Sequence, residues 1–317
     1  MAYKQIKLNS ISFPADYRLN THGCTQSLTC KFKQCPRKFL LSINRWRSRK
    51  GQEKAAIGNI VHAVLAYAYQ QDPLWNLPNL LDEIVHKSGK YSFIASDQLE
   101  YFKVVSFCLL TYYMSMYLED FKTAFFTKTE DEFAVVLPNG TVLWRGKRDG
   151  EHIIKKDNSL WIREIKTRSR INEDNMLSGL QFDFQGNLYC ITKDVEALTS
   201  GFIYDMIRTP QIKQRKGETL QEYSQRLMDD IKSRPSFYFM RFSVQLSPKD
   251  KASFSSELFH LERELIDFVQ HGNITYKNSF SCIDGYIPCE YLDACTSGVM
   301  TNYYQTDKIF EELDCGY

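Results

Sequence analysis

The chain has 317 residues, enough to bury about three quarters of the surface that it exposes when unfolded. Lys and Arg total 40 against 38 Asp and Glu, so net charge gives no sign of nucleic-acid binding, and phosphate contact would need a local patch. The sequence shows no secretory signal and no apolar run of membrane-spanning length. We therefore expect a cytoplasmic protein with no membrane partner, whose nine cysteines do not form a disulfide framework.

The N-terminal region combines a predicted helix with positive charge. The helix begins at Ser27 and runs through Cys35 and Pro36 to Leu41. Residues 31–54 hold nine Lys or Arg and one acidic residue, a density that suits contact with phosphates. A solvated surface has the same composition, so both interpretations stay open.

Residues 53–71 are predicted to form a buried helix, because the segment is apolar nearly all round. Within it, His62 has Gly58 one turn before and Ala66 one turn after. It therefore stands on a face of small side chains that another strand can approach closely. A lone histidine in such a helix is commonly a core residue, and a metal ligand is the alternative. Residues 75–127 continue the helical patterning and are interpreted as helical packing, with a lid or DNA guide as the alternative.

Residues 144–167 are predicted to form a β-hairpin that turns at Asp157 and Asn158. If those two residues form the loop, opposed residue numbers sum to 315. Asp149 then lies across from Lys166, with Glu164 as its diagonal neighbour on the same face. Two carboxylates this close repel each other unless a proton, the lysine or a divalent cation intervenes. A magnesium or manganese ion and an ordinary cross-strand salt bridge are both consistent with these three residues.

The elements after the hairpin alternate between helices and strands. A helix over residues 175–192 would carry Gln181, Gln185 and Tyr189 on one face. We then expect a strand over 199–207, a helix over 218–234, a strand over 237–246 and a helix over 248–270. Three further cysteines, in the pattern C-x₆-C-x₅-C, follow near the end of the chain: Cys282, Cys289 and Cys295.

Several short motifs together resemble one family. The segment from Gly146 to Asp149, followed by a strand ending in Glu164-Ile165-Lys166-Thr167, resembles the PD-(D/E)XK nuclease superfamily. The G-x-x-x-H pattern ending at His62 and the Q-x-x-x-Y pattern of Gln185 and Tyr189 resemble its RecB-type branch. The resemblance covers roughly residues 27–205. It implies an α/β fold with a restriction-endonuclease-like core, in which a mixed β-sheet is flanked by helices.

The resemblance also implies roles for single residues. His62, Asp149, Glu164 and the carbonyl of Ile165 would hold Mg²⁺ or Mn²⁺. Lys166 would orient the attacking water or offset charge on the phosphate. The residues that would position the DNA strand are Gln185 and Tyr189.

The resemblance extends to the cysteines and implies a second cofactor. The Cys-Pro-Arg-Lys-Phe segment at Cys35 is similar to the start of RecB-type nucleases that carry an iron–sulfur cluster, such as AddB and the CRISPR-adaptation exonucleases. Cys35 and the three late cysteines supply four thiolates, enough for a [4Fe–4S] cluster. Those families often end in C-x₂-C-x₅-C, so the wide first interval makes Cys282 the departure from the pattern. Zinc and free thiols are the alternatives.

We therefore predict a metal-dependent DNA exonuclease that acts on duplex ends or single strands in recombination, repair or processing. It would be a stand-alone phage or bacterial enzyme, in the host cytoplasm if phage-encoded, with protein partners unknown. One nuclease domain is expected over 1–317, with a helical segment at 27–128, the catalytic sheet and Q-x-x-x-Y helix at 129–207, and a cysteine-bearing extension at 208–317. The alternatives are a non-catalytic DNA-end-binding scaffold and, less favoured, a restriction-type endonuclease.

Overall fold

The computed structural model describes residues 7–49, 55–70, 76–271, 276–284, 287–311 and 313. The chain divides into two compact units, each built from separate stretches of sequence. Unit 1 comprises residues 1–52, 132–147 and 252–317, and unit 2 comprises residues 53–131 and 148–251. This division into compact units does not test the expectation of one nuclease domain over 1–317, which remains a prediction.

Unit 2 is built on a mixed β-sheet. Strand β5 (Ser159–Arg168) pairs antiparallel with the second half of β4 (Leu143–Ile154) and parallel with β6 (Gly201–Arg208). Strand β7 (Phe239–Gln245) pairs antiparallel with β6, and β3 (Ala124–Val136) pairs with β4. Every residue of β6 is buried, as expected for a strand covered on both faces.

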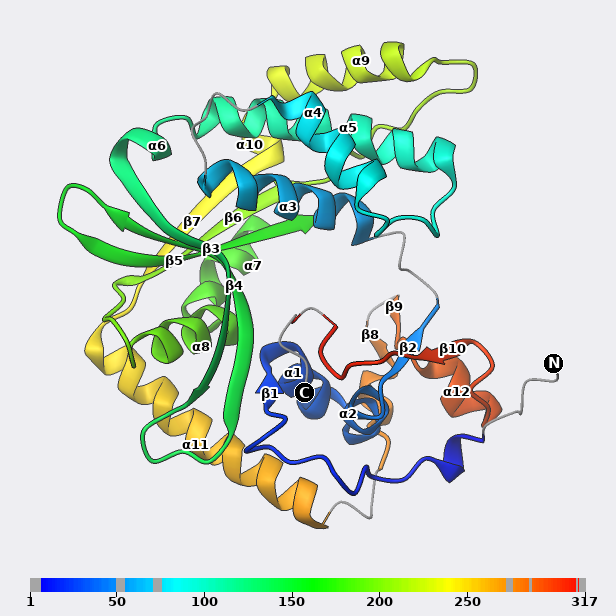
Figure 1. The fold of residues 1–317 in the computed structure, drawn as a ribbon, viewed down its shortest axis with the longest axis vertical. Coiled ribbons are helices and arrows are strands. Elements are labelled where there is room, and N and C mark those ends of the chain that lie inside the picture. The colour runs from blue at the N-terminus through cyan, green and yellow to red at the C-terminus, as the bar shows by residue number, and fades with distance from the viewer. Residues whose placement is uncertain are drawn as a thin grey trace. The chain divides into compact units, whose positions relative to one another are not determined.

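Helices cover both faces of this sheet, which confirms the predicted α/β class with a mixed sheet flanked by helices (Figure 1). On one face, α3 (Ala56–Gln70), α5 (Ser96–Met116) and α9 (Leu220–Ser233) share a hydrophobic core with Ile165 and Ile207. On the other face, α8 (Phe184–Lys193) packs on β5 and β6. Its Gly186 is required there, because a Cβ atom would lie 2.7 Å from the ring of Phe202. The remaining helices of unit 2 are α4 (Leu77–Asp82), a π-helical turn (Glu83–Lys87), α6 (Asp120–Thr123), α7 (Glu173–Gly179) and α10 (Pro235–Tyr238).

Unit 1 joins the two ends of the chain in one core. Strand β2 (Trp46–Ser48) pairs antiparallel with β10 (Tyr303–Gln305), and the buried hydroxyl of Tyr291 donates to the carbonyl of Trp46 at 2.7 Å. Phe268 of α11 (Pro248–His271) packs edge-on against Phe39. The other elements are β1 (Cys24–Thr25), which pairs parallel with the start of β4, α1 (Gln26–Gln34), α2 (Pro36–Ile43), β8 (Ile283–Asp284), β9 (Ile287–Pro288), α12 (Leu292–Ser297) and two short 3₁₀ helices, Leu8–Ser10 and Ser279–Ser281. None of the described helices is long and apolar enough to cross a membrane.

The β4–β5 hairpin forms where it was predicted, but the predicted register is wrong. Gly150 pairs with Arg163 and Ile154 with Ser159, so opposed residue numbers sum to 313 rather than 315. A two-residue type I′ loop needs positive φ at both central positions. Among the described loop residues only Asn158 has it, with φ 58°, and a four-residue connection closes the hairpin instead. Because the shift is two residues, every side chain keeps its predicted face.

The helix predicted from Ser27 to Leu41 is interrupted at Cys35. Helix α1 ends at Gln34 and α2 begins at Pro36, while Cys35 is extended with φ −165° and ψ 116°. A residue before proline is disfavoured in the α region, because the proline ring clashes with its backbone. The break turns Cys35 out of the helix and into a pocket of unit 1.

The helix predicted over 175–192 is also interrupted. Helix α7 ends at Gly179, a 3₁₀ turn covers Leu180–Phe182, and α8 begins only at Phe184. Asp183 ends the first segment and caps the second, since its carboxylate accepts the N–H of Gly186 at 2.7 Å. Gln181 is therefore exposed on the turn and does not share a helix face with Gln185.

Candidate active site and cysteine pocket

Three elements of unit 2 bring the predicted catalytic residues together. His62 comes from α3, Asp149 from β4, and Glu164 and Lys166 from β5. The small face predicted around His62 does allow close approach, because Gly58 packs against Thr167 at the end of β5. Helix α8 adds Gln185 and Tyr189 from the opposite face of the sheet.

Asp149 links the histidine helix to β5. Its Oδ1 lies 3.2 Å from Nδ1 of His62, and its Oδ2 accepts the backbone N–H of Ile165 at 2.7 Å. Burial acts to raise the pKa of Asp149, but the charge and hydrogen bond of His62, the Ile165 N–H and Lys166 together hold that pKa below its usual value. Burial acts to lower the pKa of His62, but Asp149 and the charges beyond it raise that pKa. Without a cation, the two residues therefore favour an imidazolium–carboxylate pair.

Glu164 is the most buried carboxylate of the group, with 4% of its surface exposed. Its Oε1 accepts from Lys166 Nζ at 2.5 Å and from Gln185 Nε2 at 2.7 Å. Its Oε2 is buried and has no hydrogen-bond partner among the described residues. Burial, together with the charge of Asp149, raises the pKa of Glu164 to about 8, although Lys166 acts in the opposite direction. An unpaired buried carboxylate oxygen costs free energy unless a proton or a cation satisfies it.

Gln185 and Tyr189 extend this network from α8. The side chain of Gln185 donates to Glu164 and to the hydroxyl of Tyr189 at 3.1 Å, and its carbonyl oxygen accepts from Lys166 at 2.7 Å. The lysine is therefore held between a carboxylate and an amide, with 25% of its side chain exposed. The amide fixes the orientation of both charged groups, so Gln185 serves the site by positioning them.

One further acid lies at the site and was missed by sequence reasoning. Ligand atoms of Glu130, His62 and Asp149 all lie within 4.8 Å of one another. Glu130 belongs to β3, inside the run Thr-Lys-Thr-Glu-Asp-Glu, where three consecutive acids give no reason to prefer one. No local signal in the sequence singles it out, because only the pairing of β3 with β4 brings it near Asp149.

The donor set fits a hard divalent cation. Carboxylate oxygens suit Mg²⁺ and Mn²⁺, and an imidazole adds a ligand that Mn²⁺ accepts readily. The unpaired Oε2 of Glu164 supplies a free acceptor beside Asp149. The side chain of Ile165 is buried in the core with α3 and α5, and only its backbone reaches the site. Whether its carbonyl is a ligand remains a prediction.

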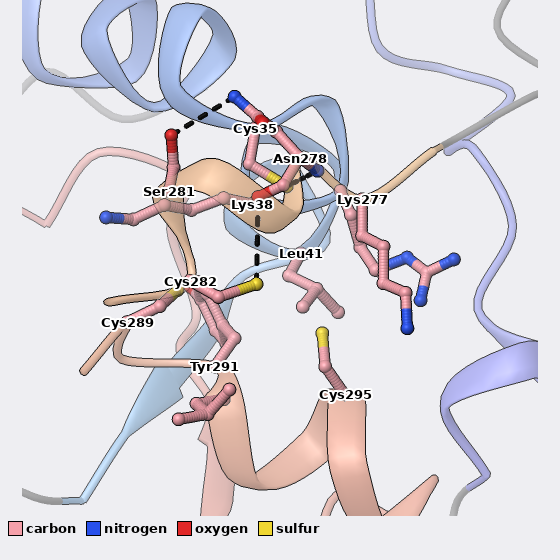
Figure 2. Close-up of a pocket in the computed structure, with 12 residues that line it drawn as sticks. Cys35, Lys38, Leu41, Lys277, Asn278, Ser281, Cys282, Cys289, Tyr291 and Cys295 are labelled. Carbon is pink, nitrogen blue, oxygen red and sulfur yellow. Dashed lines mark hydrogen bonds between the residues drawn. The ribbon is translucent and has the colours of Figure 1, made fainter. Parts of the chain in front are cut away.

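The four predicted cluster cysteines line one pocket of unit 1 (Figure 2). The backbone N–H of Asn278 donates to Sγ of Cys35 at 3.3 Å, and Sγ of Cys282 lies 3.6 Å from the carbonyl of the same asparagine. Burial raises the pKa of the Cys289 and Cys295 thiols, although Arg37 acts to lower that of Cys295. Three positive side chains, Arg37, Lys38 and Lys277, line the same pocket.

The comparison with protein families identifies the class of protein. A family model described as the PD-(D/E)XK nuclease superfamily matches residues 25–296. The chain therefore belongs to the PD-(D/E)XK nuclease superfamily, and this membership indicates a nuclease. The matched range runs from the start of α1 through Cys295 and so extends well beyond the predicted resemblance over 27–205. A search of curated proteins found no match.

Proposed function

We propose that the protein is a Mg²⁺- or Mn²⁺-dependent DNA exonuclease of the RecB-type branch, acting on duplex ends or single strands. The observation that carries the proposal is the meeting of Asp149, Glu164, Lys166 and His62, with one buried oxygen of Glu164 left unpaired. A sheet surface bearing an ordinary salt bridge would have no reason to bury that oxygen. A cation site explains both the burial and the missing partner.

The residues divide the work of phosphodiester hydrolysis. Asp149, Glu164 and His62 would hold the cation, which when bound lowers the pKa of a water ligand and stabilises charge on the phosphate. Lys166, already placed by Glu164 and Gln185, would donate to a phosphate oxygen as negative charge develops there. Gln185 and Tyr189 would keep Glu164 and Lys166 oriented while the DNA strand binds. The exposed Arg168, at the end of β5, and Arg170, just after it, would contact the DNA backbone.

Two motifs support the exonuclease assignment within the superfamily. The G-x-x-x-H histidine is in contact with Asp149, and the Q-x-x-x-Y glutamine is in contact with Glu164. Each motif therefore contacts one of the two carboxylates, as expected if both act with the metal site. The biological setting that we propose is DNA recombination, repair or processing, in a stand-alone phage or bacterial enzyme.

We further propose that Cys35, Cys282, Cys289 and Cys295, which line one pocket, hold a [4Fe–4S] cluster. Four thiolates can hold such a cluster or a zinc ion. The likeness of these cysteines to those of cluster-bearing RecB-type nucleases favours the cluster, and metal analysis distinguishes the two. The wide Cys282–Cys289 interval is accommodated by the β8 and β9 pair that lies between them.

The nuclease proposal is tested by incubating end-labelled single- and double-stranded DNA with the protein and Mn²⁺ or Mg²⁺. Wild type should release short products, and EDTA should stop the reaction. Lys166→Ala should reduce cleavage by at least about a hundredfold, since it removes a group that acts on the developing charge. Lys156→Ala, in the exposed hairpin connection, is the matched control and should leave the rate unchanged. DNA binding without cleavage by wild type would favour the scaffold alternative, and full activity of Lys166→Ala would refute the mechanism.

A further inference from the structure

The strand β3 carries an acid whose backbone conformation is unusual. Glu130 has φ 51°, in the left-handed region that residues other than glycine adopt at a cost. It lies in a thirteen-residue strand, and every other residue of that strand has a negative φ. Strained backbone of this kind persists only where the surrounding structure enforces it, and it gathers at functional sites.

The neighbours of Glu130 enforce this conformation. The Thr129 hydroxyl donates to the carbonyl of Ala66 at 3.0 Å, one helical turn after His62 on α3. On the other side, Asp131 accepts from Arg148 at 3.1 Å, immediately before Asp149 on β4. The residue before Glu130 is thus fixed to the histidine helix, and the residue after it is fixed to the aspartate strand. The kink between these two anchors places the Glu130 carboxylate with His62 and Asp149.

We propose that Glu130 is a further ligand of the divalent cation, so that three carboxylates and one imidazole form the site. This inference rests on the proposed metal-dependent function and extends it. Two independent observations support it: the three ligand atoms within 4.8 Å, and the buried, unpaired Oε2 of Glu164, a carboxylate whose charge interacts with the same Asp149. Three carboxylates carry enough negative charge to balance a divalent cation together with Lys166. Affinity for a hard cation rises with the number of charged oxygen ligands.

Cation binding without DNA is the direct test. Metal-free protein is titrated with Mn²⁺, and free Mn²⁺ is followed by electron paramagnetic resonance. Glu130→Gln keeps the size of the side chain and removes its charge, and it should weaken Mn²⁺ binding by at least about tenfold. Glu119→Gln is the matched control, because its side chain is 70% exposed and pairs only at the surface with Lys122. Asp149→Asn should abolish the same binding and so identifies the site.

Thermal unfolding separates a ligand from a structural residue. In EDTA, Glu130→Gln should change the unfolding midpoint little, because it removes repulsion by Asp149 together with attraction to the His62 imidazolium. Glu130→Gly should raise that midpoint, since glycine adopts positive φ freely. With Mn²⁺, both variants should show a smaller rise of the midpoint than wild type. A lowered midpoint in EDTA with an unchanged Mn²⁺-induced rise would make Glu130 structural and overturn the inference.

The outcomes also separate this inference from the proposed function. If wild type cleaves DNA and Glu130→Gln binds Mn²⁺ as tightly as wild type does, the inference fails and the nuclease stands. If Mn²⁺ binding requires Glu130 but wild type cleaves no DNA, the cation site stands and the nuclease fails. If wild type binds no Mn²⁺, both fail.

Discussion

The buried carboxylate of Glu164 makes the stability of unit 2 depend on pH when no cation is bound. Its pKa is raised to about 8 by burial and by Asp149, against 4.5 for an exposed glutamate. The folded state therefore keeps a proton that the unfolded chain has lost. This contribution to the free energy of unfolding is fully present below about pH 4.5 and is lost as pH rises through about 8.

Glu164→Gln should remove this dependence. In EDTA, the free energy of unfolding of the variant, minus that of wild type, should be at least about 1 kcal/mol larger at about pH 9 than at about pH 5. Urea unfolding at the two pH values measures the gain, and Mn²⁺ should reduce it by stabilising the wild type. The same variant should lose DNA cleavage, because it removes a cation ligand. An equal pH dependence in the two proteins would show that Glu164 is not a buried acid.

His152 gives the opposite pH dependence. It is fully buried on β4, stacks on Phe126 with ring centroids 5.5 Å apart, and neither ring nitrogen has a hydrogen-bond partner among the described residues. Burial and the charge of Arg163 lower its pKa to about 3, so the folded state holds it neutral. Its contribution to stability is present above about pH 6.5 and is lost as pH falls toward 3.

His152→Leu should therefore make unit 2 less sensitive to acid. The free energy of unfolding of the variant, minus that of wild type, should be about 3 kcal/mol larger at about pH 4 than at about pH 7. A pKa shift of one unit is worth about 1.36 kcal/mol. Urea unfolding at both pH values checks this. His22→Leu, at a histidine outside unit 2, is the comparison variant for the same change of residue type. Equal losses of stability in wild type and His152→Leu would refute the buried neutral histidine.

The residues of the candidate site differ in how far sequence could locate them. Strand alternation and the assumed hairpin register placed Asp149, Glu164 and Lys166 on one face, and they stay there because the register error was two residues. The contacts of His62 and Gln185 required a family resemblance, since neither residue is close to the hairpin in sequence. Glu130 was missed because its position depends on a backbone kink and on neighbours from two other elements.

At the scale of elements, an ion network fastens three strands of unit 2. Asp205 of β6 is fully buried and accepts from Tyr113 of α5 at 2.7 Å and from Arg241 of β7 at 2.5 Å. Arg163 of β5 lies 3.1 Å from the same carboxylate, and Asp120 of α6 contacts both arginines. The buried guanidinium group of Arg163 and the partly exposed one of Arg241 thus share two carboxylates. Loss of one partner from such a group leaves an uncompensated buried charge.

Asp205→Asn should destabilise the protein by about 3 kcal/mol, because it leaves the buried Arg163 and the partly exposed Arg241 with one carboxylate. Equilibrium unfolding in urea gives the value. The control is Lys122→Ala, which breaks the exposed pair with Glu119 and should cost less than about 1 kcal/mol. Similar costs for the two variants would show that the buried network adds little.

Element boundaries were predictable where a single residue decides them. Pro36 ends α1 by its effect on Cys35, and Asp183 both ends the first helical segment and caps α8. Pro36 and Asp183 are both visible in the sequence. The prediction nevertheless continued each helix across them, because helical patterning is present on either side. The hairpin loop was harder to predict, because Asp and Asn suit several turn types and only the folded strands select one.

At the scale of the whole chain, the division into two units leaves no trace in the sequence. The chain passes between units four times, and two of the crossings, at residues 131–132 and 147–148, lie inside β3 and β4, where both strands continue without a linker. A third crossing, at residues 251–252, lies inside α11. Composition reveals boundaries that fall in loops, whereas these three fall inside strands and a helix. The cysteines did indicate a link between the chain ends, because Cys35 and the three late cysteines are far apart in sequence and line one pocket.

The proposed cluster should therefore stabilise unit 1. Asn278 already contacts Cys35 across 243 residues of sequence, and a cluster would close that loop through covalent metal–sulfur bonds. By the chain-entropy argument used for cross-links, closing so long a loop is worth on the order of 5 kcal/mol. Removing the iron from anaerobically purified protein should lower the unfolding midpoint of the transition that reports on unit 1.

Single cysteine variants assign the ligands. Cys289→Ser and Cys295→Ser should each lose the visible absorption and the iron of the wild type, and a chelator should then change their unfolding midpoints little. Cys30→Ser is the matched control, because Cys30 lies on α1 outside the pocket, and it should keep both iron and midpoint. Zinc in place of iron by metal analysis would identify the rival site. Wild type that is free of metal after anaerobic purification would show that these four thiols are not ligands. The proposed cation site of unit 2 does not depend on them and would be unaffected by that result.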